Sequence, residues 1–316
     1  MRAAPGGAAE LIEGGRTWAA MGTTVRAWVA GPDAEEALDA AEARVAELEA
    51  RWSRFRDGSD VSRLNAAGGR AVAVHPETIE LVDAACRWWA ATEGRFDPTV
   101  LAALEAAGYD RDRATGHGPI GTGAPAPGCG EIDLDRRAGM VRLPPQVRID
   151  LGGIGKGWTA DLLAQQLQHH RGGLVDLGGD LRAWGRPPQG EGWPIAVDDL
   201  RDGSQLAVLG LTEGAVATSS TLRRRWSDGA RHAHHLIDPR TGRPTSGEVV
   251  SVTVVAGRAA PAEVLAKAAL VTGSVAEACD VLARHDVDAL VVPSAGPPAL
   301  VGDVAALCWV PPMEVR

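Results

Sequence analysis

Ile149-Asp150-Leu151-Gly152-Gly153-Ile154-Gly155-Lys156-Gly157 decides how this chain is interpreted, because four glycines, a carboxylate and a lysine fall within nine residues. A helix-like run follows at residues 158–170. Glycines let backbone N–H groups approach a ligand closely, since no Cβ intervenes, and a helix start adds free N–H donors and partial positive charge. The stretch therefore predicts a cradle for a phosphate or pyrophosphate, to which Lys156 adds a cation and Asp150 an acceptor.

Two widespread phosphate motifs are not met by this stretch. The P-loop requires Gly-x-x-x-x-Gly-Lys-Ser/Thr, whereas Gly157 and Trp158 follow Lys156. The glycine spacing also fits the dinucleotide-binding fingerprint poorly. A glycine turn that joins a strand to a helix explains the stretch equally well. The phosphate cradle and the simple turn therefore both stay open at this point.

The composition describes an ordinary globular protein. With 316 residues, the chain has room for one large domain or two small ones. Its net charge of −9 argues against a nucleic-acid partner, although the basic run at residues 223–225 is either a phosphate patch or a solvated strand or loop. No stretch approaches the roughly 20 apolar residues of a membrane span, so no membrane span is expected.

The cysteines and the N-terminus bear on localisation. The four cysteines lie far apart in the sequence and form no Cys-x-x-Cys, which is typical of thiols in a reducing compartment. Residues 1–10 contain neither the apolar core of a secretory signal nor a lipobox-like cysteine. We therefore expect a cytoplasmic protein with a flexible N-terminus at residues 1–15 and a short tail at 311–316.

Hydrophobic periodicity predicts an α+β fold. Alternation around Val25 and Val29 indicates a strand over residues 23–30, and apolar residues spaced three and four apart predict a helix that begins near Asp33. The strands expected in the C-terminal half mostly follow one another without intervening helices, which favours mixed or antiparallel sheets packed against helices. The Gly/Pro-rich segment 114–130 is predicted to be a mobile insertion in one domain spanning 16–310.

Several motifs follow one another in an order that resembles a known family. They are Met21-Gly22-Thr23, Trp52-Ser53-Arg54-Phe55 with Ser62-Arg63-Leu64-Asn65, Arg95-Phe96-Asp97-Pro98-Thr99-Val100, the glycine block 150–157, and Leu174-Val175-Asp176-Leu177-Gly178-Gly179-Asp180 followed by Ala217-Thr218-Ser219 and His235-Leu236-Ile237-Asp238-Pro239-Arg240-Thr241-Gly242. Over residues 18–305 this order resembles the ApbE family, the FAD:protein FMN transferases. The glycine block and the His-Leu-Ile-Asp-Pro-x-Thr-Gly block, about 80 residues apart, carry most of the specificity.

The resemblance implies a single α+β domain that binds FAD, cleaves its pyrophosphate with Mg²⁺ and moves FMN onto a Thr or Ser of a partner flavoprotein. The FAD contacts that it implies are Met21, Phe55, Arg95, Phe96, Asp97, Asp150, Lys156 and Ile237. Phe55 stands where the family usually has Tyr, so it keeps an aromatic face and loses a hydroxyl. Taken alone, Met21, Phe55 and Phe96 would each be interpreted as core residues.

His235 resembles the histidine proposed as the family's base. A hydroxyl that attacks phosphorus must lose its proton, and imidazole titrates near neutral pH. A metal cluster of His232, His234 and His235 is an alternative, but adjacent residues of a strand point to opposite faces, so His234 and His235 would not readily share one ion. A surface histidine in a turn before Asp238 is the third interpretation.

The metal position implied by the resemblance departs from the family pattern. The family holds Mg²⁺ with a backbone carbonyl at Gly153 and with Asp and Thr side chains at the positions of Glu263 and Lys267. Glu is tolerable there, whereas Lys has three donors and no acceptor. Three interpretations follow: the Lys267 ammonium, with Lys156, takes over the metal's role at the pyrophosphate; the site binds FAD without reacting efficiently; or Glu263 and Lys267 form a solvent-facing ion pair.

The sequence therefore predicts an enzyme that transfers FMN from FAD to a Thr or Ser hydroxyl of an acceptor flavoprotein and releases AMP. Two alternatives stay open: an FAD pyrophosphatase, in which water replaces the hydroxyl, and a non-catalytic FAD-binding protein. The residues expected to carry the chemistry are His235, Lys156 and Lys267.

Overall fold

The computed structural model describes residues 15–110, 118–229 and 231–310. The predicted flexible N-terminus apart from Gly15, the tail 311–316 and residues 114–117 of the predicted insertion lie outside the described residues. The chain forms two compact units. Unit 1 comprises Met1–Ala46, Lys156–Leu222 and Gly247–Arg316, and unit 2 comprises Glu47–Gly155 and Arg223–Ser246.

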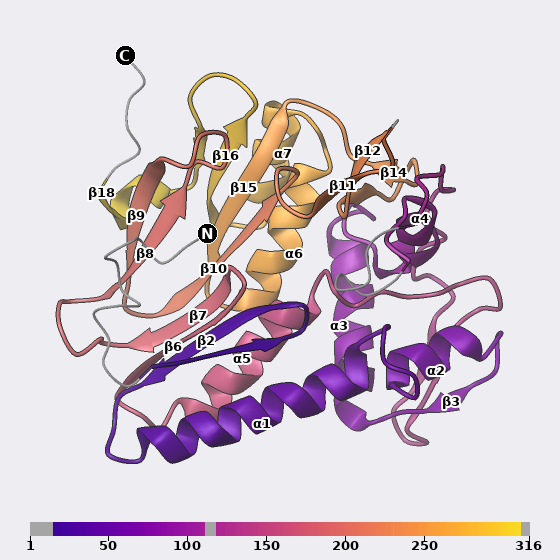
Figure 1. Cartoon of the computed structure of the whole chain (residues 1–316), viewed down its shortest axis with the longest axis horizontal. Coiled ribbons are helices and arrows are strands. Elements are labelled where there is room, and N and C mark those ends of the chain that lie inside the picture. Colours follow the sequence, from indigo (N-terminus) through magenta and orange to yellow (C-terminus); the bar gives the residue numbers. More distant parts are fainter. Residues whose placement is uncertain (1–14, 111–117, 230, 311–316) are drawn as a thin grey trace. The chain divides into compact units, whose positions relative to one another are not determined.

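Unit 1 is built on an eight-stranded sheet in which every neighbouring pair is antiparallel (Figure 1). In spatial order its strands are β1 (Arg16–Ala20), β2 (Thr23–Val29), β6 (Gly172–Leu177), β7 (Asp180–Gly185), β10 (Gly214–Ser220), β15 (Val249–Ala256), β16 (Asp288–Pro293) and β17 (Ala299–Val301). A smaller antiparallel sheet contains β8 (Trp193–Asp198), β9 (Gln205–Leu211) and β18 (Cys308–Val310).

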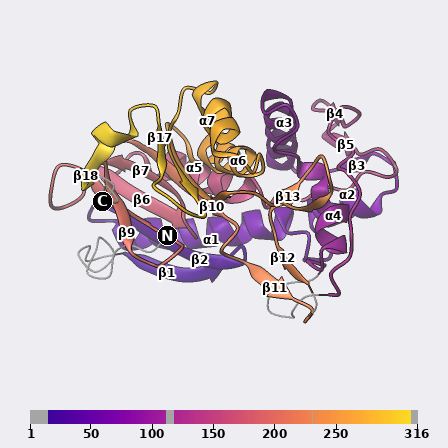
Figure 2. The ribbon, with the colours of Figure 1, turned by 90° about the horizontal axis from the view of Figure 1, so that it is seen from above.

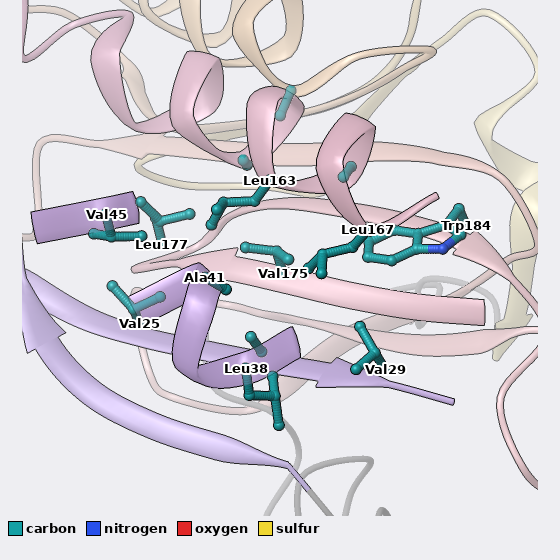
Figure 3. Packing of buried hydrophobic residues seen from close by; sticks show 14 of the residues in the cluster. Val25, Val29, Leu38, Ala41, Val45, Leu163, Leu167, Val175, Leu177 and Trp184 are labelled. Carbon is teal, nitrogen blue, oxygen red and sulfur yellow. The ribbon is translucent and has the colours of Figure 1, made fainter. Parts of the chain in front are cut away.

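The helices of unit 1 are the first part of α1 (Ala34–Trp52), then α5 (Gly155–Leu167), α6 (Ala259–Leu270), α7 (Val275–Ala283) and the short η3 (Val304–Leu307). Figure 3 shows Leu38 of α1 and Leu163 of α5 in one apolar cluster with Val25 and Val175 of the sheet. Trp28 lies between Ala27 and Val29 of that cluster and belongs to a second one, with Trp193 of β8. The large sheet therefore buries both of its faces.

Unit 2 combines short helices with small sheets (Figure 2). Its helices after the end of α1 are α2 (Asp60–Ala66), α3 (Pro76–Ala91), η1 (Pro98–Val100) and α4 (Leu101–Ala106). Its strands are β3 (Val72–Ala73), β4 (Asp133–Asp135) and β5 (Met140–Arg142) in one sheet, and the pairs β11 (Arg225–Ser227) with β12 (His232–His234) and β13 (Ile237–Asp238) with β14 (Arg243–Pro244). Leu104, Trp226 and Ile237 share a buried apolar cluster.

The α+β class with antiparallel sheets is confirmed, and the expected strand at residues 23–30 appears as β2. For residues 118–130 the expectation of a mobile insertion stays a prediction. This segment has no helix or strand, but it is held by backbone hydrogen bonds from Gly121 to Ala106 (2.6 Å) and from Ala126 to Pro239 (2.7 Å). None of the helices in the described ranges is both long and apolar enough to cross a membrane.

Candidate functional site

The glycine block leads into helix α5 without a preceding strand. Residues 149–151 are irregular, and the N–H of Asp150 donates to the carbonyl of Pro98 (2.8 Å). The helix then starts at Gly155, whose N–H donates to the carbonyl of Leu151 (2.7 Å). A glycine turn between a strand and a helix was one interpretation of this block. The helix is present, but no strand precedes the glycines, so that part of the interpretation is wrong.

Gly157 has a packing reason to be glycine. A Cβ at this position would lie 2.5 Å from the carbonyl oxygen of Ala259, at the start of α6. Real side chains do not tolerate such a distance, so only glycine lets the first turn of α5 lie against the first turn of α6. This close approach brings the charged residues of the two helices together.

Four charged groups of unit 1 meet beside this contact, and we call Lys156, Asp180, Glu263 and Lys267 the lysine–glutamate cluster. The Lys156 ammonium donates to Glu263 Oε1 (2.8 Å) and to Asp180 Oδ2. The Lys267 ammonium donates to the same Glu263 Oε1 (2.9 Å). The backbone N–H of Gly157 donates to Glu263 Oε2 (2.8 Å). One carboxylate therefore joins two ammonium groups and the first turn of α5.

The burial of this cluster differs between its anions and its cations. The side chains of Glu263 and Asp180 are 0% and 5% exposed, whereas those of Lys156 and Lys267 are 13% and 16% exposed. Burial alone would raise the pKa of Glu263, but the charges of Lys156 and Lys267 outweigh it and hold this pKa below its ordinary value. Because Glu263 is fully buried, the interpretation as a solvent-facing ion pair is wrong.

A second polar site lies in unit 2, and we call Arg54, Phe55, Tyr109 and Asp150 the Arg54 cluster. Arg54 Nε donates to Asp150 Oδ2 (2.7 Å), and another guanidinium nitrogen donates to the Tyr109 carbonyl (2.6 Å). The guanidinium carbon lies 4.0 Å from the centre of the Phe55 ring, a cation–π distance. Tyr109 contacts Phe55 edge to face, with 5.9 Å between the ring centres. It stacks on Trp226, with 5.6 Å between the ring centres.

The predicted contacts Arg95, Phe96 and Asp97 follow α3 in unit 2. Asp97 caps η1 through its carboxylate, which accepts from the N–H (2.8 Å) and hydroxyl (2.6 Å) of Thr99. Burial raises the pKa of Asp97, while the bonds from Thr99 lower it. Arg95 pairs with Glu93 (2.7 Å), and Phe96 is buried. Asp97 and Phe96 thus have structural roles, whatever ligand role they also have.

Met21 and Ile237 lie in separate units. Met21 occupies the two-residue turn between β1 and β2 with φ of +52°, and Gly22 follows with φ of +66°. A positive φ is uncommon for a side-chain-bearing residue and is enriched at functional sites. The Thr159 hydroxyl donates to the Met21 sulfur (3.6 Å). Ile237 is buried in the apolar cluster of unit 2.

The three histidines near β12 have different surroundings. His234 accepts from the N–H of Leu236 at Nδ1 (3.3 Å), so its Nε2 carries the proton and donates to the Thr245 carbonyl (3.1 Å). Burial lowers the pKa of His234. Both ring nitrogens are thus used by the backbone, which is a further argument against the alternative of a three-histidine metal cluster. His232 is exposed, and His235 follows the strand as a partly exposed residue.

Among the described residues, one group of three side chains has ligand atoms close enough to hold a metal ion: Asp33, His169 and His170, in unit 1. Neither Gly153 nor Glu263, which the resemblance implies as metal ligands, belongs to this group. Gly153 lies in the turn that precedes α5. The predicted metal role of Gly153 and Glu263 stays a prediction.

The structure adds three residues to which sequence reasoning gave no role in the site. Asp180 follows the Gly178–Gly179 turn at the start of β7 and contacts Lys156. Arg54 and Tyr109 complete the cluster around Asp150 and Phe55. Two consecutive glycines with positive φ just before Asp180 were the available signal, because such a turn fixes the direction of the next side chain.

Comparisons with known proteins show to which family this chain belongs. The ApbE family model matches residues 21–291. The chain is 32% identical over 294 residues to an FAD:protein FMN transferase of Treponema pallidum, covering 85% of this chain and 81% of the relative. It is 30% identical over 273 residues to an FAD:protein FMN transferase of Salmonella typhimurium, and the match covers 81% of this chain and 76% of that relative.

Solved structures give the same result. The ApbE protein of Thermotoga maritima superposes with a TM-score of 0.84 at 27% identity, covering 93% of this chain and 98% of that one. The flavinyl transferase ApbE of Pseudomonas stutzeri superposes with a TM-score of 0.77 at 25% identity, and the match covers 93% of this chain and 96% of that one. This chain is a member of the ApbE family.

Proposed function

We propose that this protein is an FAD:protein FMN transferase, which moves FMN from FAD onto a Thr or Ser hydroxyl of an acceptor flavoprotein and releases AMP. The names of its relatives support this function. The observation that carries it in the structure is the lysine–glutamate cluster, because Lys156 and Lys267 place two ammonium groups beside the first turn of α5. Ammonium groups and a helix N-terminus are both suited to binding phosphate oxygens.

The reaction needs charge neutralisation and one proton acceptor. The acceptor hydroxyl oxygen forms a bond to the phosphorus of the FMN half, and the bond from that phosphorus to the bridging oxygen breaks. AMP leaves with the bridging oxygen, and the hydroxyl proton passes to a base, for which we propose His235. Most of the catalysis then comes from positioning and from stabilising phosphate charge, which we assign to Lys156 and Lys267.

The flavin and adenine rings need flat apolar partners. The Arg54 cluster offers the Phe55 ring next to a guanidinium, and Arg54 is held in place by Asp150 (2.7 Å). Such a surface is suited to stacking an aromatic ring. We propose the predicted contacts Met21, Arg95, Phe96, Asp97 and Ile237 as additional FAD contacts.

The residues present do not fit the Mg²⁺ ion that the resemblance implies. Mg²⁺ requires oxygen ligands in near-octahedral geometry. Both carboxylate oxygens of Glu263 accept hydrogen bonds from N–H donors, and Lys267 has no acceptor atom. We therefore assign no reaction step to a metal ion. For location we propose the cytoplasm, and we propose residues 16–310 as the functional domain.

The first prediction concerns the choice among flavins. We expect the purified protein to bind FAD more tightly than FMN or riboflavin, because the lysine–glutamate cluster is suited to a pyrophosphate, which only FAD contains. Isothermal titration calorimetry with the three flavins measures this preference. Equal dissociation constants for FAD and FMN would contradict the assignment of the cluster to the pyrophosphate.

The two alternatives from the sequence give different products. Incubation with FAD alone yields AMP and free FMN from a pyrophosphatase, and leaves FAD intact for a binding protein. A transferase that strongly excludes water releases little AMP until an acceptor protein is added. Chromatography of the nucleotides with and without acceptor therefore separates the three functions.

A further inference from the structure

Lysine is unusually rare in this chain. Lys156 and Lys267 are its only two lysines, although lysine and arginine together number 32. They are 111 positions apart in the sequence, yet both ammonium groups donate to the same oxygen, Oε1 of Glu263 (2.8 and 2.9 Å). A lysine ammonium is a compact point charge, whereas the guanidinium of arginine is a wide planar fork. Both compact cations of the chain therefore lie in this cluster, whereas the other members of the lysine and arginine total are arginines.

Three of the roughly four acceptor positions of the Glu263 carboxylate are occupied by N–H donors. Oε1 accepts from the two ammonium groups, and Oε2 accepts from the N–H of Gly157 (2.8 Å). Lys267 lies one helical turn after Glu263 on the same face of α6. A divalent cation at Glu263 would have to displace an ammonium and would repel the other one.

The charges of the cluster are balanced without a metal ion. Lys156 and Lys267 are matched by Glu263, which contacts both lysines, and by Asp180, which contacts Lys156. The carboxylates are the deeper members, at 0% and 5% exposed, and the lysines are the outer ones, at 13% and 16%. The accessible side of the cluster is therefore cationic, as an anion site requires.

We propose that the Lys267 ammonium, seated on Glu263, takes the place of a divalent cation, so that this chain binds and cleaves the FAD pyrophosphate without metal. This inference rests on the proposed function. In the transfer step the bond from the FMN phosphorus to the bridging oxygen breaks, and negative charge grows on the departing AMP phosphate. Lys267 and Lys156 face that charge, while the hydroxyl proton goes to His235. The step needs no oxidant, reductant or further reactant.

The two lysines allow a direct test in the wild-type protein. Protein labelled with ¹³C at lysine Cε gives two side-chain NMR signals, which the variant Lys267→Met assigns. We expect both signals to shift on adding FAD in EDTA, and neither to shift on adding Mg²⁺ alone. The FAD dissociation constant, measured by calorimetry, should agree within about twofold in EDTA and in millimolar Mg²⁺.

Variants at Lys267 reverse this behaviour. Lys267→Thr removes the ammonium and supplies a hydroxyl oxygen, so FAD binding in EDTA should weaken at least about tenfold, and Mn²⁺ binding should appear by electron paramagnetic resonance. Lys267→Met should weaken FAD binding equally without gaining Mn²⁺. The matched control Arg284→Thr removes an exposed cation of unit 1, and it should leave both measurements unchanged.

Three outcomes would overturn the inference. A wild-type FAD affinity that rises strongly with Mg²⁺ would show that a metal is needed. A Lys267 NMR signal that does not shift on adding FAD would show that this ammonium serves only the packing of α5 against α6. Absence of FAD binding in both buffers would refute the proposed function itself, and with it this inference.

Discussion

Replacement of His235 by alanine should lower the rate of FMN transfer by about 10²–10⁴-fold, the usual contribution of a general base. His235 lies directly after β12 and is partly exposed, so the variant should still fold. The FAD dissociation constant should stay within a few-fold, because the lysine–glutamate cluster is unchanged. Single-turnover transfer to an acceptor protein and calorimetric titration with FAD measure the two quantities separately.

Neighbouring histidines provide the controls for this variant. His232→Ala changes an exposed residue of β12 and should leave transfer unchanged. His234→Ala removes bonds to Leu236 and Thr245, so it should lower stability by about 1–2 kcal/mol and affect transfer much less than His235→Ala. Comparable losses of transfer at His234 and His235 would contradict the assignment of His235 as the base.

Replacement of Glu263 by glutamine should lower the free energy of unfolding by about 3–5 kcal/mol, the usual effect of removing one member of a buried charged network. Glutamine has the same length but no charge, so Lys156 and Lys267 would lose their shared counterion. Unfolding in urea, followed by circular dichroism at pH 7, measures this loss. Glu277→Gln, at an exposed site in α7, is the matched control and should change stability by less than about 0.5 kcal/mol.

The difference in unfolding free energy between the wild type and Glu263→Gln should depend on pH, because the pKa of Glu263 is lowered in the folded protein. The folded protein holds this pKa at about 2, below the ordinary value of 4.5. The charged carboxylate therefore contributes its full stability above pH 4.5, and that contribution is lost as the pH falls toward 2. The gap between wild type and Glu263→Gln should shrink over this range. A gap that is constant from pH 7 to about pH 3 would show that Glu263 acts through packing alone.

Much of the fold was predictable because hydrophobic periodicity reports burial. Val25 and Val29 alternate with residues of the other face, and they do lie in β2 with their side chains in one apolar cluster. The strand β7 was not predicted, because its sequence, Asp-Leu-Arg-Ala-Trp-Gly, alternates only over Asp180–Ala183 and residues of both faces are buried. Periodicity detects a strand in which the alternation runs along its length, as in β2, and misses one in which it is brief, as in β7.

Some members of the candidate site were predictable, but their contacts were not. The resemblance implied Lys156, Glu263 and Lys267, and the spacing of four correctly placed the last two on one helix face. The contact of Asp180 with Lys156 depends on how β7 packs beside α5, which local sequence does not encode. Ser274 stands at the N-cap of α7, where serine often caps, but its side chain makes no cap hydrogen bond. Instead, Glu248 Oε1 accepts from the N–H of Val275 (2.9 Å).

The most direct test of the proposed function follows the FMN phosphorus itself. FAD radiolabelled in the phosphate of its FMN half is incubated with this protein and an acceptor flavoprotein that was expressed without covalent flavin. We predict that label and flavin fluorescence appear on the acceptor after denaturing electrophoresis, with one AMP released per label, and that a Thr→Ala change at the modified residue abolishes both. AMP released together with free labelled FMN, and no label on the acceptor, would contradict the proposed transfer.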